Sequence, residues 1–285
     1  MISVRDLTKT CGEIRVKVQG GLGNQLFQIA NGLNLALIYD LPISFHYNKT
    51  KNRNFVAGFS KISPGNLYRF DGKQCLEIEN KPHTYCNFNK YIEKSFRFEE
   101  IKLKGRHVEL QGYFQSFRYF SHIEEYMRTS IMEQFNIIDS NKNLVDIALH
   151  IRLGDYYRNR HNRKIYLLPS YSYLSDSIKK MEELISNTTG SIRVFTDDSK
   201  LLNKLYGEYF QKKPHYIFQG NSMESFTEFA NHNNKIISNS TFSWWAAWTT
   251  NGNIISPTNW FKKKSGLDLV TSDLIPPEWN LIQNE

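Results

Sequence analysis

The chain has 285 residues, a formal net charge of +8 and 40% hydrophobic residues. Its length predicts two domains, because one domain usually holds roughly 100–200 residues. The positive charge predicts an anionic partner, but the cations are spread along the chain without a zinc finger, a basic zipper or an RNA-binding aromatic pattern. We therefore do not expect nucleic acid to be the partner, and favour a phosphorylated small molecule or an anionic membrane surface.

Cysteine usage and the first residues bear on the compartment. Cys11, Cys75 and Cys86 are an odd number without zinc-knuckle spacing, which favours a reducing environment. The first ten residues carry charge and lack the apolar core of a secretory signal, and no apolar stretch approaches the ~18 residues that a spanning helix needs. We expect a cytoplasmic protein with scope for peripheral contact at an anionic inner membrane.

The first part of the chain predicts strand, glycine turn, helix and strand in that order, which opens a Rossmann-like half. The expected elements are a strand over 15–19, a turn over 20–24, a helix over 25–38, a strand over 41–45, a strand over 108–114 and a helix over 123–135. Residues 48–100 show only weak periodicity.

The second part alternates strands and helices, which predicts a parallel sheet with helices on both faces. The expected strands are 144–151, 192–196, 216–219, 235–238 and 254–256, and the expected helices are 171–186, 201–210, 223–230 and 243–250. A polar stretch over 136–143 predicts the boundary between a domain of residues 1–140 and a domain of residues 141–285, with a tail that could pack back on the first domain.

Polar residues follow several of these strands at the point where each strand ends. His150, Arg152 and Asp155 follow one strand, Asp197 and Asp198 follow another, and the run 239–243 follows a third. In open α/β sheets ligands bind outside the carboxyl ends of the strands. The pattern therefore predicts one ligand site built from several loops.

The glycine turn contains Gly21, Gly23 and Asn24, but matches neither the dinucleotide fingerprint nor the P-loop. Glycine lets the backbone approach a ligand closely, the following helix offers N–H groups, and the Asn24 amide could donate to an oxygen. The alternative is a tight turn with Asn24 as a helix cap.

Two charged groups suit a nucleotide diphosphate. The guanidinium of Arg152 can bind phosphate through a bidentate fork, oriented by Asp155, although a surface ion pair is the alternative. Asp197 and Asp198 are adjacent, so on a strand their side chains point apart and do not form a shared metal site. They suit acceptance of hydrogen bonds from a guanine edge, or, for Asp198, a helix cap.

A run of hydroxyl side chains precedes an aromatic pair near residue 240. Ser240, Thr241, Phe242 and Ser243 lie at an expected helix start, where hydroxyl and N–H groups form an anion site. The tryptophans that follow, Trp244, Trp245 and Trp248, are typical of helix packing.

Taken together, these strings resemble the α-1,2-fucosyltransferases of glycosyltransferase family eleven. The matching strings are GGLGNQLFQIANGLNLA (20–36), QGYFQSFRYF (111–120), HIRLGDY (150–156), FTDD (195–198), ISNSTFSWWAAW (237–248), SPTNWFK (256–262) and IPPEWNLI (275–282). They occur in the family's order over nearly the whole chain, and resemble its bacterial members, which often decorate O-antigens.

The resemblance implies a GT-B-like fold, with two Rossmann-like domains facing across a cleft. The second domain would bind GDP-fucose, and the first a galactose-terminated acceptor. Arg152 matches the arginine that grips the β-phosphate, His150 a histidine lining the nucleotide site, Asp197 or alternatively Asp198 the carboxylate at guanine, and Asn24 an amide reaching the donor. Thr241, Phe242 and Ser243 match the segment that meets phosphate. The implied reaction is an inverting transfer of L-fucose to a galactose 2-hydroxyl that needs no metal or other cofactor.

One residue departs from the family pattern, and the general base is open. The family usually has a second arginine after the first, where this chain has Leu153. Leu153 keeps open the alternative of a non-catalytic nucleotide or carbohydrate binder, and the glycine turn that of a dinucleotide-dependent oxidoreductase. Carboxylates and histidines on plausible loops offer four candidate bases, namely Asp155, Asp40, Glu13 and His46.

Overall fold

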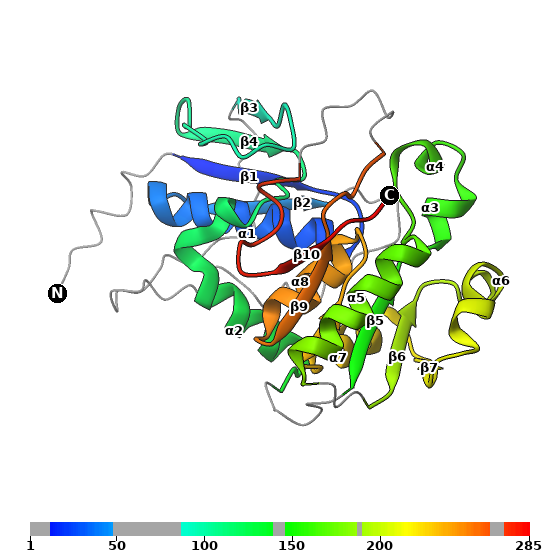
Figure 1. Cartoon of the computed structure of the whole chain (residues 1–285). Coiled ribbons are helices and arrows are strands. Elements are labelled where there is room, and N and C mark those ends of the chain that lie inside the picture. Colours follow the sequence, from blue (N-terminus) through cyan, green and yellow to red (C-terminus); the bar gives the residue numbers. More distant parts are fainter. Residues whose placement is uncertain (1–11, 48–86, 139–145, 187–189, 263–270) are drawn as a thin grey trace. The chain divides into compact units, whose positions relative to one another are not determined.

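A computed structural model describes residues 12–47, 87–138, 146–186, 190–262 and 271–285. The chain divides into two compact units, Met1–Met127 and Arg128–Glu285 (Figure 1). The division falls inside helix α2 (Glu124–Phe135), earlier than the predicted boundary at residue 140, which lies outside the described residues. The functional roles predicted for the two halves stay predictions.

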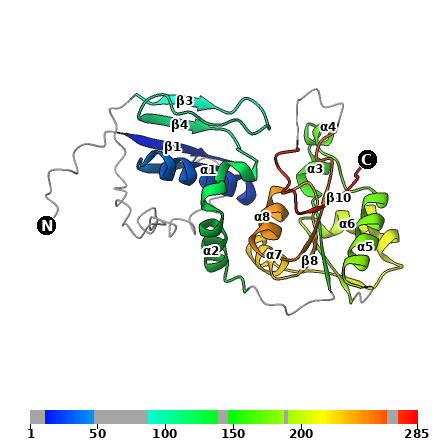
Figure 2. The same cartoon turned by 60° about the vertical axis from the view of Figure 1, so that its left-hand side comes forward.

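The first unit contains a four-stranded parallel sheet in the order β2-β1-β4-β3. The strands are β1 (Glu13–Val18), β2 (Ile43–Tyr47), β3 (Asn89–Ile92) and β4 (His107–Gln111). Helix α1 (Leu22–Tyr39) packs along this sheet (Figure 2) and buries nearly every residue from Leu22 to Ala36. The 3₁₀ segment η5 (Phe117–Ile123) packs on α1 through buried aromatic rings such as Phe27 and Phe120.

The second unit contains a six-stranded parallel sheet in the order β10-β9-β8-β5-β6-β7. Its strands are β5 (Ile147–Ile151), β6 (Ile192–Thr196), β7 (His215–Ile217), β8 (Asn234–Ile236), β9 (Asn253–Pro257) and β10 (Asn280–Ile282). Its helices are α3 (Gly154–Arg158), α4 (Asn162–Ile165), α5 (Tyr171–Leu184), α6 (Ser199–Phe210), α7 (Ser222–Ala230) and α8 (Thr241–Thr249).

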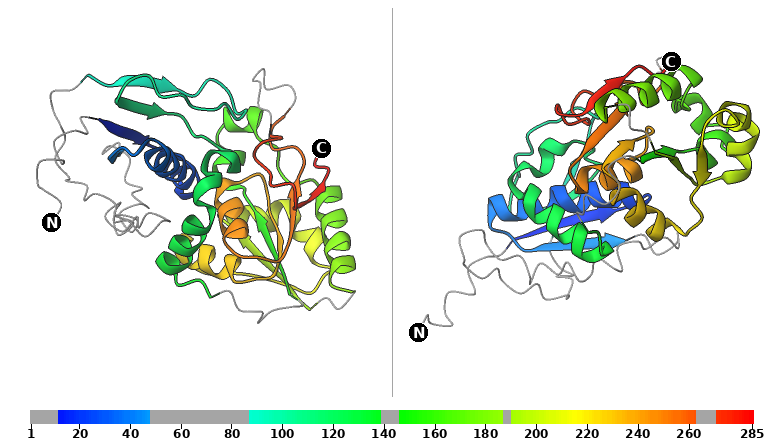
Figure 3. Two further views of the ribbon diagram at one scale, coloured as in Figure 1. Left: turned by 90° about the vertical axis from the view of Figure 1, so that its left-hand side faces the viewer. Right: turned by 60° about the horizontal axis from the view of Figure 1, so that its bottom comes forward.

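The second sheet lies between two layers of helices (Figure 3). On one face α5 and α6 bury apolar side chains such as Leu174 and Leu202 against β5 and β6. On the other face α7 and α8 pack together, with the rings of Phe226 and Phe242 in edge contact. The strand β5 is buried along its whole length, as the predicted apolar run over 144–151 requires.

A buried lysine joins the ends of the last two of these helices. Lys235, in β8, has no exposed surface. Its ammonium donates to the carbonyl of His232 (2.6 Å), the hydroxyl of Thr250 (2.9 Å) and the carbonyl of Asn251 (3.2 Å). These acceptors follow α7 and α8 directly, where helix dipoles favour a cation. Lys235 thus holds α8 with its N-terminus toward the carboxyl ends of the strands.

The predicted α/β class is confirmed, with one fully parallel sheet in each unit. Five elements were not predicted: the edge strands β3 and β10, the 3₁₀ segment η5, and the short helices α3 and α4, which lie where the sequence suggests a polar turn. The strands β3 and β10 have only four and three residues, and neither shows an alternating pattern that could be detected. In the part of the chain that the structure describes, we find no helix long and apolar enough to cross a bilayer.

Candidate functional site

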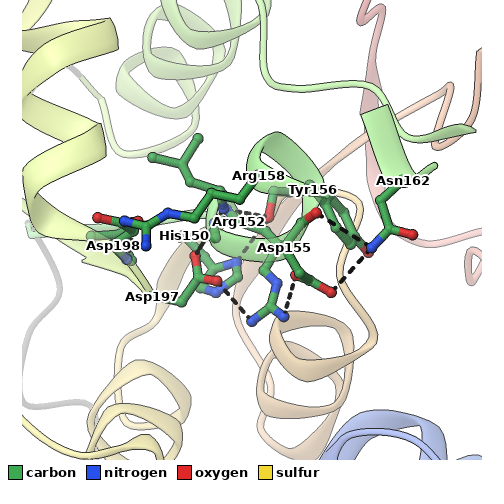
Figure 4. A network of polar contacts seen from close by, with 12 residues as sticks. His150, Arg152, Asp155, Tyr156, Arg158, Asn162, Asp197 and Asp198 are labelled. Atoms are coloured by element: carbon green, nitrogen blue, oxygen red, sulfur yellow. Dashed lines mark hydrogen bonds and ion pairs between the residues drawn. The ribbon is translucent and has the colours of Figure 1, made fainter. Parts of the chain in front are cut away.

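The guanidinium of Arg152 lies just beyond the carboxyl end of β5, held between two carboxylates (Figure 4). Its Nη2 is 2.7 Å from an oxygen of Asp155, and its Nη1 is 3.1 Å from Oδ2 of Asp197. The ring of Tyr156 lies on a further side, with its centroid 5.6 Å from Cζ of Arg152. The Arg152 side chain is 28% exposed, so it is fixed in place and still accessible to a ligand.

The charge of Arg152 is secure. Burial alone would lower the pKa of the Arg152 guanidinium. The nearby carboxylates of Asp197 and Asp155 raise this pKa by more than burial lowers it, so the net shift is upward. Two of its five N–H groups are used by these carboxylates, which leaves donors for a ligand oxygen. The predicted orientation of Arg152 by Asp155 is present in the structure, and Asp197 contributes a second contact that sequence reasoning did not assign.

Asp197 organises the loop that carries Arg152. Its Oδ1 accepts hydrogen bonds from the backbone N–H groups of Leu153 (2.8 Å) and Gly154 (3.2 Å), while Oδ2 meets Arg152. A Cβ at Gly154 would lie 2.3 Å from Oδ2, so only glycine lets the carboxylate approach this closely. Both carboxylate oxygens of Asp197 therefore have partners within the protein. The predicted contact of Asp197 with guanine stays a prediction.

Asp198 has a different set of partners. One of its oxygens caps α6 by accepting from the N–H of Leu201 (3.0 Å), and the other is paired with Arg158. The two adjacent acids thus serve separate partners, and the helix-cap alternative for Asp198 is confirmed. Among the described residues there is no group of three or more histidine, cysteine or acidic side chains placed to hold a metal ion.

His150 is a buried, neutral component of the site. It is 5% exposed, and its ring lies against Phe229 and Phe242. Burial, followed by the charge of Arg152, lowers the pKa of His150 to about 3. Its Nδ1 lies 2.8 Å from the hydroxyl oxygen of Ser238, and that oxygen also accepts from the backbone N–H of Arg152 (3.2 Å). His150 therefore supports the Arg152 loop through Ser238.

The N-terminus of α8 adjoins this loop. Ser240 is the N-cap residue but makes no capping hydrogen bond with its side chain. The Ser243 hydroxyl is buried and donates to the carbonyl of Ser240 (3.1 Å), which uses its proton within the helix. Thr241 and Phe242 are partly exposed. Of the predicted hydroxyl groups at this helix start, Thr241 is the better placed for a ligand.

Tyr156 and Asn239 join the two loops and were not predicted as site residues. The Tyr156 hydroxyl donates to the carbonyl of Asn239 (3.0 Å), and its ring stacks on Tyr166 at 3.9 Å between centroids. Burial raises the pKa of Tyr156, so its hydroxyl stays protonated. The sequence offered one signal for Tyr156, since it lies within the same HIRLGDY string as Arg152.

In the first unit the predicted glycine turn opens α1. Gly21 is the N-cap residue, and Gly23 and Asn24 lie in the first turn of the helix, so Asn24 is not the cap. The Oδ1 of Asn24 accepts from Nε2 of Gln115 at 3.0 Å. Gly20 adopts a φ of +87°, and a Cβ there would lie 2.8 Å from the Asn24 amide nitrogen. The turn thus makes room for the Asn24 side chain.

Two sequence comparisons decide the family. The model of the glycosyl transferase family 11 matches residues 85–283, more than half of the chain. An alpha-1,2-colitosyltransferase of Escherichia coli is 32% identical over 290 residues, which cover 94% of this chain and 98% of that protein. The chain belongs to glycosyl transferase family 11.

A second curated protein and a solved structure are also similar to this chain. The O-antigen biosynthesis glycosyltransferase WbnK of Escherichia coli is 26% identical over 292 residues, covering 86% of this chain and 93% of that protein. Among solved structures, POFUT1 in complex with GDP aligns with 12% identity and a TM-score of 0.47, covering 87% of this chain and 99% of that chain. The family resemblance of the sequence is confirmed by the family model and the colitosyltransferase, and both Escherichia coli relatives are named as sugar transferases rather than oxidoreductases.

The candidate bases of this family 11 chain lie in different places. Glu13 begins β1 and hydrogen-bonds Ser44, and Asp40 ends α1 in the left-handed conformation, so both lie at the amino-end edge of the first sheet. His46 is near the end of β2, and burial, followed by Arg15, lowers its pKa. Asp155 is paired with Arg152. Glu13 and Asp40 are therefore away from the strand ends where the glycine turn lies.

Glu93 is a carboxylate at the carboxyl end of the first sheet that sequence reasoning missed. It follows β3 and accepts from the backbone N–H groups of Tyr113 (2.6 Å) and Phe114 (2.9 Å). Burial raises its pKa, while these two hydrogen bonds act in the opposite direction. Glu93 fixes the turn that leads to Gln115, the partner of Asn24. It lay in a stretch without detectable periodicity, so nothing in the sequence pointed to it.

A cavity of about 630 Å³ opens beside α7 in the second unit. Phe218 and Gln219, which follow β7, form one part of its wall, and α7 contributes Met223, Glu224 and Glu228. Further lining residues come from the C-terminal end of α2 and from α7, namely Gln134, Phe135, Asn136 and Thr227. The cavity combines aromatic surface with carboxylate and amide acceptors.

Proposed function

We propose that this family 11 glycosyltransferase transfers L-fucose from GDP-β-L-fucose to the 2-hydroxyl of a terminal β-galactose, in the synthesis of an O-antigen or a related glycan. The observation that carries the proposal is the guanidinium of Arg152, held by Asp155 and Asp197 beside the N-terminus of α8. A diphosphate is the ligand that suits such a group, because guanidinium and helix amides both favour phosphate oxygens.

The reaction is a single displacement. The acceptor 2-oxygen forms a bond to C1 of fucose, the bond from C1 to the β-phosphate oxygen of GDP breaks, and the 2-hydroxyl proton leaves to a base or to water. Negative charge builds on the leaving diphosphate, and Arg152 and the start of α8 stabilise it. Attack from the face opposite GDP converts the β-linked donor into an α-linked product, and in this proposal no metal is required.

Leu153 is compatible with this role for Arg152. Its side chain is fully buried in the core formed by β5, α5 and α6, on the opposite side of the backbone from Arg152. An arginine at this position would have to bury its charge in that core or displace the chain. The non-catalytic alternative therefore gains no support from Leu153, although GDP binding without turnover remains its test.

As an alternative to the contact between guanine and Asp197 that the family resemblance implies, we place the nucleotide base in the cavity beside α7. Strands β5 and β7 are separated by one strand, so Arg152 and Phe218 lie about 10 Å apart in the direction across the sheet, a span comparable to that of an extended nucleoside diphosphate. Glu224 supplies an acceptor for the N–H groups of guanine, and Phe218 an aromatic wall. In Glu224→Gln the preference for GDP over inosine diphosphate, which lacks the 2-amino group, should shrink; an unchanged preference contradicts this placement.

Colitose is the second candidate sugar, because the relative that is 32% identical is an alpha-1,2-colitosyltransferase. Colitose is L-fucose without its 3-hydroxyl, so the two donors share the diphosphate and the anomeric geometry. The same Arg152 chemistry serves either donor. A direct competition between GDP-fucose and GDP-colitose, read as the ratio of kcat/KM, decides between them.

The test of the proposed function is transfer to a panel of galactosides with each donor, with and without EDTA. Product linkage is read by NMR, and an α-1,2-fucoside is the expected result. Arg152→Ala should lose activity while Arg160→Ala, a substitution of an exposed arginine on the same segment, should keep it. A correctly folded protein that binds GDP but transfers neither sugar would refute the proposal.

A further inference from the structure

The segment that follows Arg152 carries a group of exposed cations. Arg158, Arg160, Arg163 and Lys164 lie on α3, α4 and the turn between them, and Lys262 joins them by donating to the carbonyl of Arg163 (2.6 Å). All five residues are exposed. We call these five residues the basic face.

Little of this charge is neutralised within the protein. Between residues 154 and 166 the sequence contains a single acid, Asp155, and it is paired with Arg152. Arg158 is paired with Asp198. Among the described residues, no carboxylate lies within ion-pair distance of the other four cations.

The arrangement of these charges suits an extended anionic surface better than one small anion. Arg163 and Lys164 are neighbours on a four-residue helix, so their side chains project about 100° apart. Arg160 lies on the preceding turn and Lys262 on a separate part of the chain. Side chains that diverge in this way do not converge on a single phosphate, but each can meet a different headgroup of a bilayer.

We propose that the basic face docks this protein on a membrane that contains anionic phospholipid. Groups of four to eight exposed lysines and arginines bind such surfaces electrostatically. Because the basic face continues directly from the Arg152 loop, docking would hold the carboxyl-end edge of the second sheet near the membrane, where a membrane-linked acceptor would be found. The proposal does not depend on which sugar is transferred.

The experiment is sedimentation of the full chain with lipid vesicles. Vesicles of phosphatidylcholine alone are compared with vesicles that also contain phosphatidylglycerol, and salt is raised from about 0.05 M to about 0.5 M, which shortens the screening length. We expect binding only to the anionic vesicles, and its loss at high salt. Equal binding to neutral vesicles, or no binding to anionic vesicles at low salt, would overturn the proposal.

Matched charge reversals locate the surface. The variant R160E/R163E/K164E should bind anionic vesicles at least about tenfold more weakly. The control K179E/K204E/K212E makes the same change in net charge with exposed lysines on α5, on α6 and just after α6. Since α5 and α6 run back from the carboxyl ends of the strands, these lysines lie toward the opposite edge of the sheet. The control should keep most of the vesicle binding.

Activity on a soluble galactoside separates docking from catalysis. R160E/R163E/K164E should retain the KM for the donor and kcat of the wild type, because none of these side chains contacts Arg152 or α8 in the structure. If both triple variants lose vesicle binding equally, net charge rather than the basic face is responsible. If the R160E/R163E/K164E variant instead raises the donor KM, the basic face belongs to the donor site. Either result overturns the proposal.

Discussion

The two units present different chemistry at the same place in their sheets. At the carboxyl-end edge of the second sheet stand charged groups, with Arg152 and Arg158 paired to Asp197 and Asp198. At the carboxyl-end edge of the first sheet the Asn24 amide is bonded to Gln115, and the carboxylate of Glu93 is bound to backbone N–H groups rather than to a cation. One parallel α/β architecture can therefore bring either kind of group to its strand ends.

This difference matches two kinds of ligand. Fixed charges suit a diphosphate, whose negative charge grows as it leaves. Neutral amides suit sugar hydroxyls, because an amide can both donate and accept without the cost of burying a charge. The contrast supports the proposal that the second unit binds the donor diphosphate and the first binds the sugar acceptor.

The largest expected effect is at Arg152. Arg152→Ala should lower kcat about 10²–10³-fold, because removing one donor to a developing anion costs about 2.7–4 kcal/mol. Arg152→Lys should recover part of this loss, since it keeps the charge but not the bidentate geometry. Steady-state kinetics with GDP-fucose measures both, and thermal unfolding checks that the variants are folded. Equal activity of wild type and Arg152→Ala contradicts the account.

The next effect is at Gly154. Gly154→Ala places a Cβ 2.3 Å from Oδ2 of Asp197, which must move and release Arg152. We expect kcat to fall at least about tenfold, because Arg152 would no longer be held where the leaving diphosphate needs it. Gly207→Ala in α6 is the control, because a Cβ there meets no atom within 4 Å and alanine favours a helix. The control should be fully active and slightly more stable to heat.

The charge state of His150 predicts an acid sensitivity. Its pKa is lowered from 6.5 to about 3 in the folded protein, so the unfolded chain takes up this proton first as pH falls. The stability from neutral His150 is therefore complete above pH 6.5 and is lost progressively toward about pH 3. His150→Gln should flatten this part of a plot of Tm against pH. A slope unchanged by the substitution would show that His150 is not the group responsible.

The smallest expected effect is in the first unit. The family resemblance implies that Asn24 reaches the donor, whereas the contrast above assigns it to the acceptor. Asn24→Ala should therefore raise the KM for the galactoside several-fold, corresponding to about 1 kcal/mol for one neutral hydrogen bond, with little change in GDP affinity. Gln115→Ala should act through the same contact, so the double variant should lose less than the sum of the two single losses. Additive losses, or a loss of GDP affinity instead, would remove the division of roles between the two units.

Much of the fold was predictable because hydrophobic periodicity is local. The alternation of strand and helix fixes parallel pairing, and strand 192–196 was predicted at the bounds where β6 is found. The short helix α3 was missed because Asp197, a residue 43 positions away, supplies the acceptor for its first N–H groups. No local pattern contains that contact.

The same limit applies to the site. Arg152 could be singled out from its position after a buried strand, and its pairing with Asp155 from their spacing. The sequence could not decide how Asp197 and Asp198 divide their roles, since this depends on which loop each side chain meets. Glu93 and the cavity beside α7 arise from contacts between segments distant along the chain, so they became visible only in the structure.

The most direct test of the central claim compares the binding of GDP and GMP by calorimetry, in the wild type and in Arg152→Ala. These nucleotides differ by the β-phosphate that Arg152 is proposed to hold. The account predicts that the wild type binds GDP much more tightly than GMP, and that Arg152→Ala binds the two almost equally. A preference for GDP that survives intact in Arg152→Ala would contradict it.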